Sequence, residues 1–187
     1  MGNQSSVQAS LSAGARYRLV SPEDEDTLTN DAAASELLKD FTRQAPVIVR
    51  SSREIQEVKK TLDVSGETFC VVINRNDEVV GIVTLKDLIG SWPMSLANQR
   101  GSTIADIVAR DIMRSVWRLP TIELGKLQDL KIDELITIFK GLHSDYLLVM
   151  DTVAVGAEEQ VICGLLSADE LSRRLGIRVN PDPGPGS

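Results

Sequence analysis

The chain of 187 residues contains one short unit twice, and this duplication limits the possible folds more than any other feature. The two copies read Gly81-Ile-Val-Thr-Leu-Lys-Asp-Leu88 and Gly164-Leu-Leu-Ser-Ala-Asp-Glu-Leu171. Their spacing is too long for a solenoid repeat and suits a small domain that occurs twice with a linker. The sequence therefore predicts an internally duplicated α/β protein.

The residues around each copy predict the same order of elements, β-α-β-β-α. The first unit shows strands at residues 46–49, 69–73 and 79–83, with a helix from Ser51 that a Ser51/Glu54 capping box begins. The second shows strands at 119–122, 146–150 and 160–166, with a helix marked by Ile132, Leu135, Ile136 and Phe139. We expect further helices at 31–39 and 103–113 and a loop at 151–159. The α/β (α+β) class follows from this order.

Composition divides the chain into five parts. We expect a disordered polar leader at 1–30, a first unit at 31–91, a connector at 92–110, a second unit at 111–178 and a breaker-rich tail at 179–187. The 42% of hydrophobic residues is enough for a buried core between the two ends.

The charge balance and the apolar runs exclude several classes of partner. With 27 acidic against 20 basic residues the net charge is −7, which opposes the phosphate neutralisation that nucleic-acid binding needs. No apolar run approaches the roughly 20 residues that span a bilayer, and no signal-peptide pattern opens the chain. We therefore expect a cytoplasmic protein with no nucleic-acid partner and no membrane span.

Catalytic and metal-binding constellations are not found in the sequence. His143 is the only histidine, which rules out multi-histidine metal sites and histidine-based triads. Cys70 and Cys163 lie in apolar strand-like runs, where a thiol is usually a small buried hydrophobe. We predict no catalytic residue, no metal and no required cofactor, and hence no enzyme.

The first residues fit a lipidation pattern. Met1-Gly2-Asn3-Gln4-Ser5-Ser6 matches the signal for myristoylation of Gly2. The favoured interpretation is a polar leader that matches a short pattern by chance.

Each copy of the duplicated unit is first of all a helix start. Thr84 with Asp87, and Ser167 with Glu170, have the spacing of capping boxes that satisfy free backbone N–H groups at a strand-to-helix turn. The same place suits a ligand, because a helix N-terminus attracts anions. A carboxylate in the first turn of the helix can also accept hydrogen bonds from both hydroxyls of a ribose. Ribose and phosphate together indicate a nucleotide.

The sequence here resembles the cystathionine-β-synthase (CBS) domain family, in the tandem arrangement called a Bateman module. The matching segments are Pro46-Val-Ile-Val49, the helix from Ser51, Phe69-Cys-Val-Val-Ile-Asn74 and Val79-Val-Gly-Ile-Val-Thr-Leu-Lys-Asp-Leu88. The stretch from Asp111 to Leu175 resembles a more diverged copy. The resemblance covers about residues 40–177.

This resemblance implies two units packed sheet to sheet, with clefts that bind AMP, ADP, ATP or S-adenosylmethionine as regulatory ligands. It implies that Asp87 holds the ribose, that Thr84 contacts a phosphate, and that Thr42 and the backbone near Val47 flank the adenine. A homodimer and an unidentified regulated protein are the expected partners.

The second copy departs from the family pattern. Glu170 is one methylene longer than the usual Asp, and Ser167 replaces Thr, so this copy predicts a weaker second site at Ser167 and Glu170. Two hypotheses follow: a non-catalytic sensor that binds an adenine nucleotide, or a structural dimerisation module whose clefts have lost their ligands.

Overall fold

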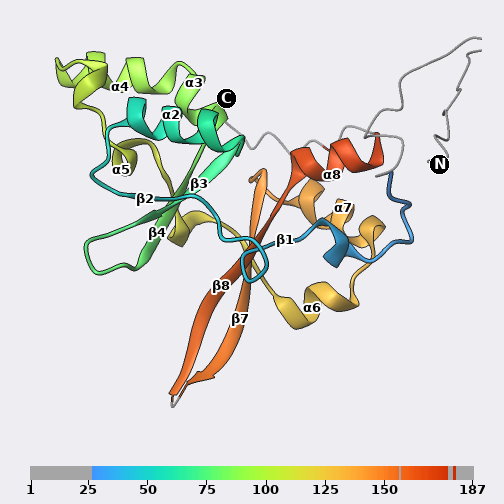
Figure 1. Ribbon diagram of the computed structural model, residues 1–187. Coiled ribbons are helices and arrows are strands. Elements are labelled where there is room, and N and C mark those ends of the chain that lie inside the picture. The colour runs from blue at the N-terminus through green and yellow to red at the C-terminus, as the bar shows by residue number, and fades with distance from the viewer. Residues whose placement is uncertain (1–26, 156, 177–178, 180–187) are drawn as a thin grey trace, which may run out of the picture.

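In the computed structural model, two four-stranded sheets pack face to face and carry their helices on the outer sides (Figure 1). The structure describes residues 27–155, 157–176 and 179. Most of the predicted leader, with Gly2, and most of the predicted tail lie outside these residues. The predicted α/β class and the duplicated topology are confirmed.

The first sheet has the order β2-β3-β4-β5. Its strands are β2 (Ile48–Arg50), β3 (Phe69–Ile73), β4 (Val79–Thr84) and β5 (Arg114–Ser115), and the helices α2 (Ile55–Ser65) and α3 (Leu85–Ile89) complete the unit. β2 runs parallel to β3, and β3 runs antiparallel to β4. Helix α2 buries Ile55, Val58 and Leu62, as their helical spacing predicts.

The second sheet repeats this arrangement in the order β1-β8-β7-β6. Its strands are β1 (Lys39–Asp40), β6 (Thr121–Glu123), β7 (Tyr146–Val155) and β8 (Ala157–Ser167), with helices α6 (Leu124–Asp129), α7 (Ile132–Gly141) and α8 (Ala168–Leu175). β6 is parallel to β7, and β7 is antiparallel to β8. The first unit therefore has the predicted β-α-β-β-α order, and the second has the same order with one additional helix, α6, before α7.

Each sheet is completed by a strand that belongs to the other unit in the sequence. β1 lies in the first unit, at 31–91, but pairs with β8, and β5 lies in the second unit, at 111–178, but pairs with β4. The 3₁₀ helix η1 (Ala34–Leu37), which comes directly before β1, also packs on the second unit, where Ala34 and Leu37 are buried and Leu28 is partly buried. The division into units at 31–91 and 111–178 stays a prediction, but the units exchange their edge strands.

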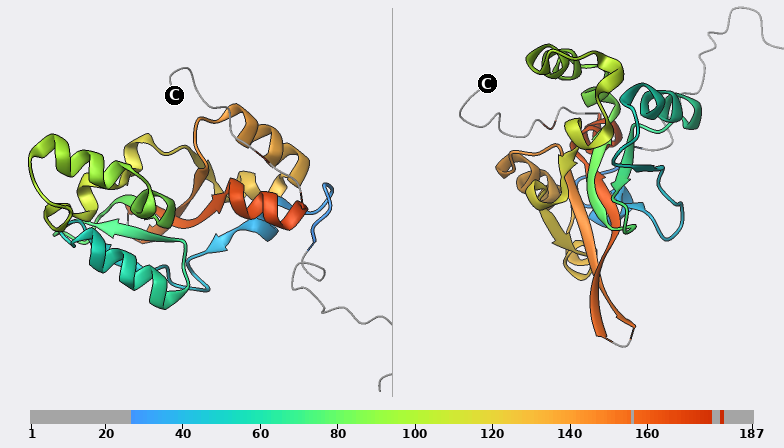
Figure 2. Two further views of the ribbon diagram at one scale, coloured as in Figure 1. Left: turned by 90° about the horizontal axis from the view of Figure 1, so that it is seen from above. Right: turned by 90° about the vertical axis from the view of Figure 1, so that its left-hand side faces the viewer.

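Three apolar cores hold the layers together. One lies under α7 and α8, one under α2 and α3, and the third lies between the two sheets, where Phe69, Val71 and Ile82 face Tyr146 and Leu148. This third core lies between the sheets, and the ribbon views in Figure 2 show from two further sides how the sheets are arranged. None of the helices in the described ranges combines the length and the apolarity that a bilayer crossing requires.

The predicted start of the first long helix is wrong. Ser51 and Glu54 form no capping box: Glu54 is the N-cap residue and makes no side-chain cap bond, while the Ser51 N–H donates to the Ile73 carbonyl. The chain turns before the helix begins, and the Ile55 N–H donates to the Ile107 carbonyl at 3.1 Å. A carbonyl from the connector thus satisfies the first amide of the helix, one of those that a helix N-terminus leaves without a partner in the helix.

The connector also differs from its prediction. It contains the helix α4 (Trp92–Arg100), which the sequence did not predict, and the expected helix at 103–113 is broken into the 3₁₀ helix η2 (Ile104–Asp106) and the short helix α5 (Ala109–Ile112). Two separate caps cause the break: the Thr103 N–H donates to Asp106 at 2.9 Å, and the Val108 N–H donates to Asp111 at 3.0 Å. Each begins a new helical turn.

The predicted loop at 151–159 and the predicted helix at 31–39 are corrected as well. β7 and β8 continue as a hairpin up to the pair Val155 and Ala157, which projects beyond the sheets in Figures 1 and 2. The β-branched valines at positions 153 and 155 favour this strand extension. At 31–39 only the one-turn helix η1 forms before the chain becomes extended in β1.

Both cysteines are free and buried, as their apolar surroundings predict. Burial raises the pKa of the Cys70 thiol to about 12, so very little thiolate forms at pH 8. We expect folded protein to react with iodoacetamide at least tenfold more slowly than guanidinium-unfolded protein, as followed by mass spectrometry. Fast modification of the folded chain at both thiols would contradict this prediction.

Candidate functional site

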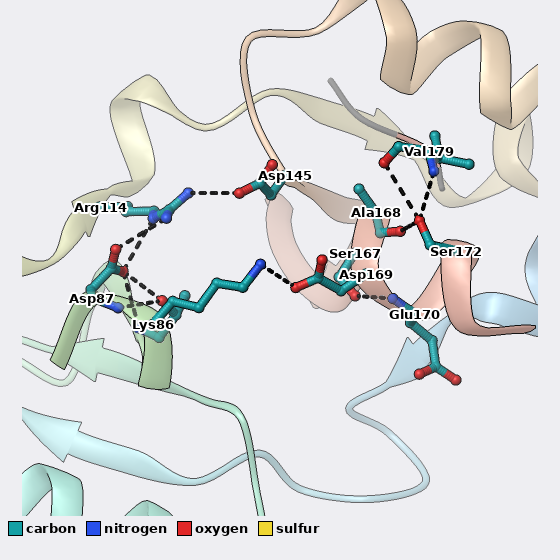
Figure 3. A network of polar contacts seen from close by, with 11 residues as sticks. Lys86, Asp87, Arg114, Asp145, Ser167, Ala168, Asp169, Glu170, Ser172 and Val179 are labelled. Atoms are coloured by element: carbon teal, nitrogen blue, oxygen red, sulfur yellow. Dashed lines mark hydrogen bonds and ion pairs between the residues drawn. The ribbon is translucent and has the colours of Figure 1, made fainter. Parts of the chain in front are cut away.

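The two copies of the duplicated unit bring the N-termini of α3 and α8 close together between the units (Figure 3). In each copy the first helical amide donates to a carbonyl just before the neighbouring strand: Leu85 to Thr68 at 2.7 Å, and Ala168 to Asp145 at 2.9 Å. A salt bridge of 2.7 Å joins Lys86 to Asp169, which hold the same position in the two copies. The hydrogen bond and charge of Asp169 raise the pKa of Lys86.

The first copy forms the capping box that the sequence predicts. The buried Thr84 hydroxyl accepts the Asp87 N–H at 3.1 Å and donates to the Asp87 carboxylate at 2.7 Å. The Thr84 N–H donates to the same carboxylate at 3.3 Å. Neither residue lines any of five well-formed cavities in the described part of the chain.

Arg114, which sequence reasoning missed, binds the carboxylate expected to hold the ribose. Its Nε and Nη2 atoms donate to the two oxygens of Asp87 at 3.1 and 3.0 Å. Its guanidinium lies 5.2 Å from the ring centroid of Tyr146 and 4.0 Å from Asp145. Burial by itself lowers the pKa of Arg114, but hydrogen bonding and the charge of Asp87 outweigh it, and the net pKa is raised.

Lys39 holds the corresponding place in the second unit. Arg114 pairs across its sheet with Ile82 and Lys39 with Leu165, the same position of the two copies. The Lys39 ammonium lies 5.3 Å from the ring centroid of Phe69 and forms a salt bridge with Glu67. A cation therefore lies over an aromatic ring beside each helix start, but only the first one binds the motif carboxylate.

The second copy forms half of its predicted capping box. The Ser167 hydroxyl accepts the Glu170 N–H at 3.1 Å, as expected. The Glu170 carboxylate does not return to the Ser167 amide, because it accepts two hydrogen bonds from Arg173 at 3.0 and 2.7 Å. The hydrogen bonds from Arg173 lower the pKa of Glu170. The longer side chain thus lies along its own helix.

Ser167 and Glu170 line two adjoining cavities of about 320 and 290 Å³. Both cavities also touch Thr68 and Tyr146. The larger has an apolar floor that includes Phe69 and Leu165, and a polar rim that includes Lys39, Gln44 and Arg174. Burial raises the pKa of the Tyr146 phenol, against the effect of Arg114, so its O–H stays a donor at neutral pH.

The other two predicted site residues, Thr42 and Val47, share none of these five cavities with Asp87. Thr42 donates to Asp40 beside β1 and lines a cavity of about 630 Å³ that it shares with Asp151 and Cys163 of the second sheet. The Val47 carbonyl accepts the Val71 N–H at 2.8 Å, within the first sheet. The exchange of edge strands accounts for the position of Thr42, because Thr42 follows β1, which pairs with β8 of the second sheet.

Among the described residues, no group of three or more His, Cys, Asp or Glu side chains is arranged to hold a metal ion. The helix starts offer hydrogen-bonding groups, aromatic rings and neighbouring cations.

Comparison with known proteins identifies the first unit. Residues 38–92 match the model of the CBS domain. Comparison with curated protein sequences gives no significant match.

Solved structures resemble the whole arrangement at low sequence identity. An uncharacterised conserved protein from Pyrococcus horikoshii is 20% identical with a TM-score of 0.52, over 77% of this chain and 92% of its own. A hemolysin-like protein containing a CBS domain from Oenococcus oeni is 16% identical with a TM-score of 0.50, over 78% and 91%. CBSX2 of Arabidopsis thaliana, solved in complex with AMP, is 18% identical with a TM-score of 0.48, over 75% and 93%. The fold is therefore that of CBS-domain proteins.

Proposed function

We propose that this chain, which belongs to the CBS-domain family through residues 38–92, is a non-catalytic regulatory module that binds an adenine nucleotide. The proposed ligand occupies the cavity of about 320 Å³ at the start of α8. This cavity carries the proposal, because it combines a motif helix start, an aromatic floor and a charged rim. Its volume lies at the lower end of the roughly 300 to 1,000 Å³ of small-molecule sites.

The lining offers a partner for each part of a nucleotide. The rings of Phe69 and Tyr146 provide faces for a base. The Glu170 carboxylate accepts two hydrogen bonds from Arg173, and a carboxylate has about four acceptor positions, so it retains capacity for ribose hydroxyls. Lys39 and Arg174 line the same cavity and favour an anionic group there.

Titration calorimetry with AMP tests the proposal, with ADP, ATP and S-adenosylmethionine as further ligands. We expect AMP to bind the full chain, and Glu170→Gln to weaken its binding at least tenfold, because the amide is a poorer acceptor for the ribose hydroxyls. Since AMP would bind only the folded chain, it should also raise the melting temperature of the wild type.

Glu123→Gln is the matched control, because Glu123 is exposed, pairs with Lys126 on the surface and lines none of these cavities. Its affinity for AMP should equal that of the wild type. Absence of heat with all four ligands, or equal affinities for Glu170→Gln and the wild type, would reject the proposed site.

A structural dimerisation module is the second candidate function. The bidentate Arg114–Asp87 pair favours it, since it occupies the carboxylate that the first copy would present to a ligand. This alternative predicts an oligomer whose mass by light scattering and whose melting temperature do not respond to nucleotides.

Under either function we propose a homodimer that acts on a regulated protein of unknown identity in the cytoplasm. The two free cysteines are consistent with a reducing compartment. Light scattering of the purified chain measures its association directly.

A further inference from the structure

The Asp87 carboxylate already accepts four hydrogen bonds in this structure, three at Oδ2 and one at Oδ1. It accepts the Thr84 N–H, the Thr84 hydroxyl and two N–H groups of Arg114. An ionised carboxylate offers about two acceptor positions on each oxygen, so one position remains on Oδ1, whereas two ribose hydroxyls would need two. The two Thr84 bonds belong to the cap of α3, so only the two from Arg114 are replaceable.

We propose that Arg114 is an internal latch: it occupies the Asp87 carboxylate and closes the ligand site beside it, which we call the Asp87 cleft. The resting chain then binds nucleotide only in the cavity of about 320 Å³ that Ser167 and Glu170 line, which we call the Ser167 cleft. This inference rests on the proposed function and explains the unequal use of two similar sites. The latch closes the site that matches the family pattern and leaves open the one that departs from it.

The surroundings of Arg114 hold it against Asp87. Its backbone is fixed in β5, where it pairs with Ile82 of β4. Its guanidinium lies between Asp87 and the more distant Asp145 (Figure 3), and it also lies 5.2 Å from the ring centroid of Tyr146. The side chain of Asp87 is 19% exposed and that of Arg114 31% exposed, so water competes weakly for this pair. A planar guanidinium that forms two parallel hydrogen bonds gives a directional contact.

The second unit shows what the same place looks like without a latch. Lys39 occupies the position of Arg114 but its ammonium pairs with Glu67. An ammonium is a compact point charge and does not form the planar, two-pronged contact of a guanidinium. Glu170 turns toward Arg173 and stays on the wall of the cavity. The choice of Arg or Lys at this edge-strand position thus distinguishes a closed cleft from an open one.

Calorimetric titration with AMP of the full-length Arg114→Met variant tests the latch. Methionine keeps much of the length and apolar stem of the side chain and removes both hydrogen bonds. We expect the number of AMP molecules bound per chain to rise from one in the wild type to two. In the double variant Arg114→Met with Asp87→Asn, the count should return to one.

Arg110→Met is the matched control, since Arg110 is an exposed arginine of the neighbouring helix α5 and should leave the count at one. Arg114→Lys keeps the positive charge but cannot form the two parallel hydrogen bonds of a guanidinium, so it should open the Asp87 cleft only partly. Its affinity for AMP at that cleft should be lower than that of Arg114→Met. Circular dichroism confirms that each variant is folded before titration.

The outcomes separate the latch from the proposed function. One AMP per chain in both the wild type and folded Arg114→Met keeps the proposed function and overturns the latch. Loss of AMP binding in Arg114→Met also overturns it, because Arg114 would then contact the ligand. Binding by Arg114→Met alone, abolished by Asp87→Asn, supports the latch and rejects the Ser167 cleft. Absence of binding in every variant overturns both.

Discussion

A Gly81→Val variant is expected to be less stable than the wild type by roughly 3 kcal/mol, because the cost of overpacking falls on backbone atoms. A Cβ atom at this position would lie 2.6 Å from the Arg114 carbonyl oxygen and 3.0 Å from the Met113 sulfur. The carbonyl belongs to β5 and cannot rotate away, so the edge strand would have to leave β4. Urea unfolding followed by circular dichroism measures the loss.

Gly125→Ala is the control for this substitution, because a Cβ atom there meets nothing within 4 Å. Gly125 lies inside α6, where alanine is the better helix former, so this variant should gain about 0.5–1 kcal/mol. If Gly81→Val retained the stability of the wild type, the close approach of β5 to β4 would be wrong.

Phe139→Ala is expected to lower the free energy of unfolding by about 3–5 kcal/mol, because it removes a large side chain from a filled core. Phe139 lies on α7, is fully buried and packs in the core under α7 and α8. A loss of this size approaches the whole stability of many domains. Guanidinium unfolding with equal slopes for both proteins would give the value directly.

Ile138→Ala is the neighbouring comparison, since Ile138 is only partly buried against the same core. The expected loss is clearly smaller than that of Phe139→Ala, because the removed atoms leave a site that water can reach. Equal losses at the two positions would show that α7 does not direct Phe139 into the core more than Ile138, contrary to the structure.

The local patterns in the sequence were sufficient to predict the two units. β3 coincides with the predicted strand at 69–73, because five consecutive apolar residues occur there and the first four of them are buried. The stripe on α7 is correct because Ile132, Leu135 and Phe139 are all fully buried. The Thr84/Asp87 box is correct because both of its bonds lie within four residues.

Features that depend on distant residues could not be predicted in this way. β1 and β5 have two residues each, too few for a periodic signal, and pair with strands far away in the sequence. The Arg114–Asp87 pair joins residues 27 positions apart. The Glu170 carboxylate accepts hydrogen bonds from Arg173 instead of the predicted one from the Ser167 amide, and the sequence is compatible with either partner. The sequence therefore predicted the helix starts of the candidate site, but it did not predict the cations that bind their carboxylates, Arg114 and Arg173.

The exchange of edge strands has a consequence for the origin of the duplication. A single ancestral unit with this arrangement would have left one edge of its sheet unpaired, and an unpaired edge invites association with another chain. A second copy could have supplied the missing strand by the same contacts that β1 and β5 make today. Association of two identical chains would then have preceded their fusion, and the present chain would preserve that ancient dimer inside one polypeptide.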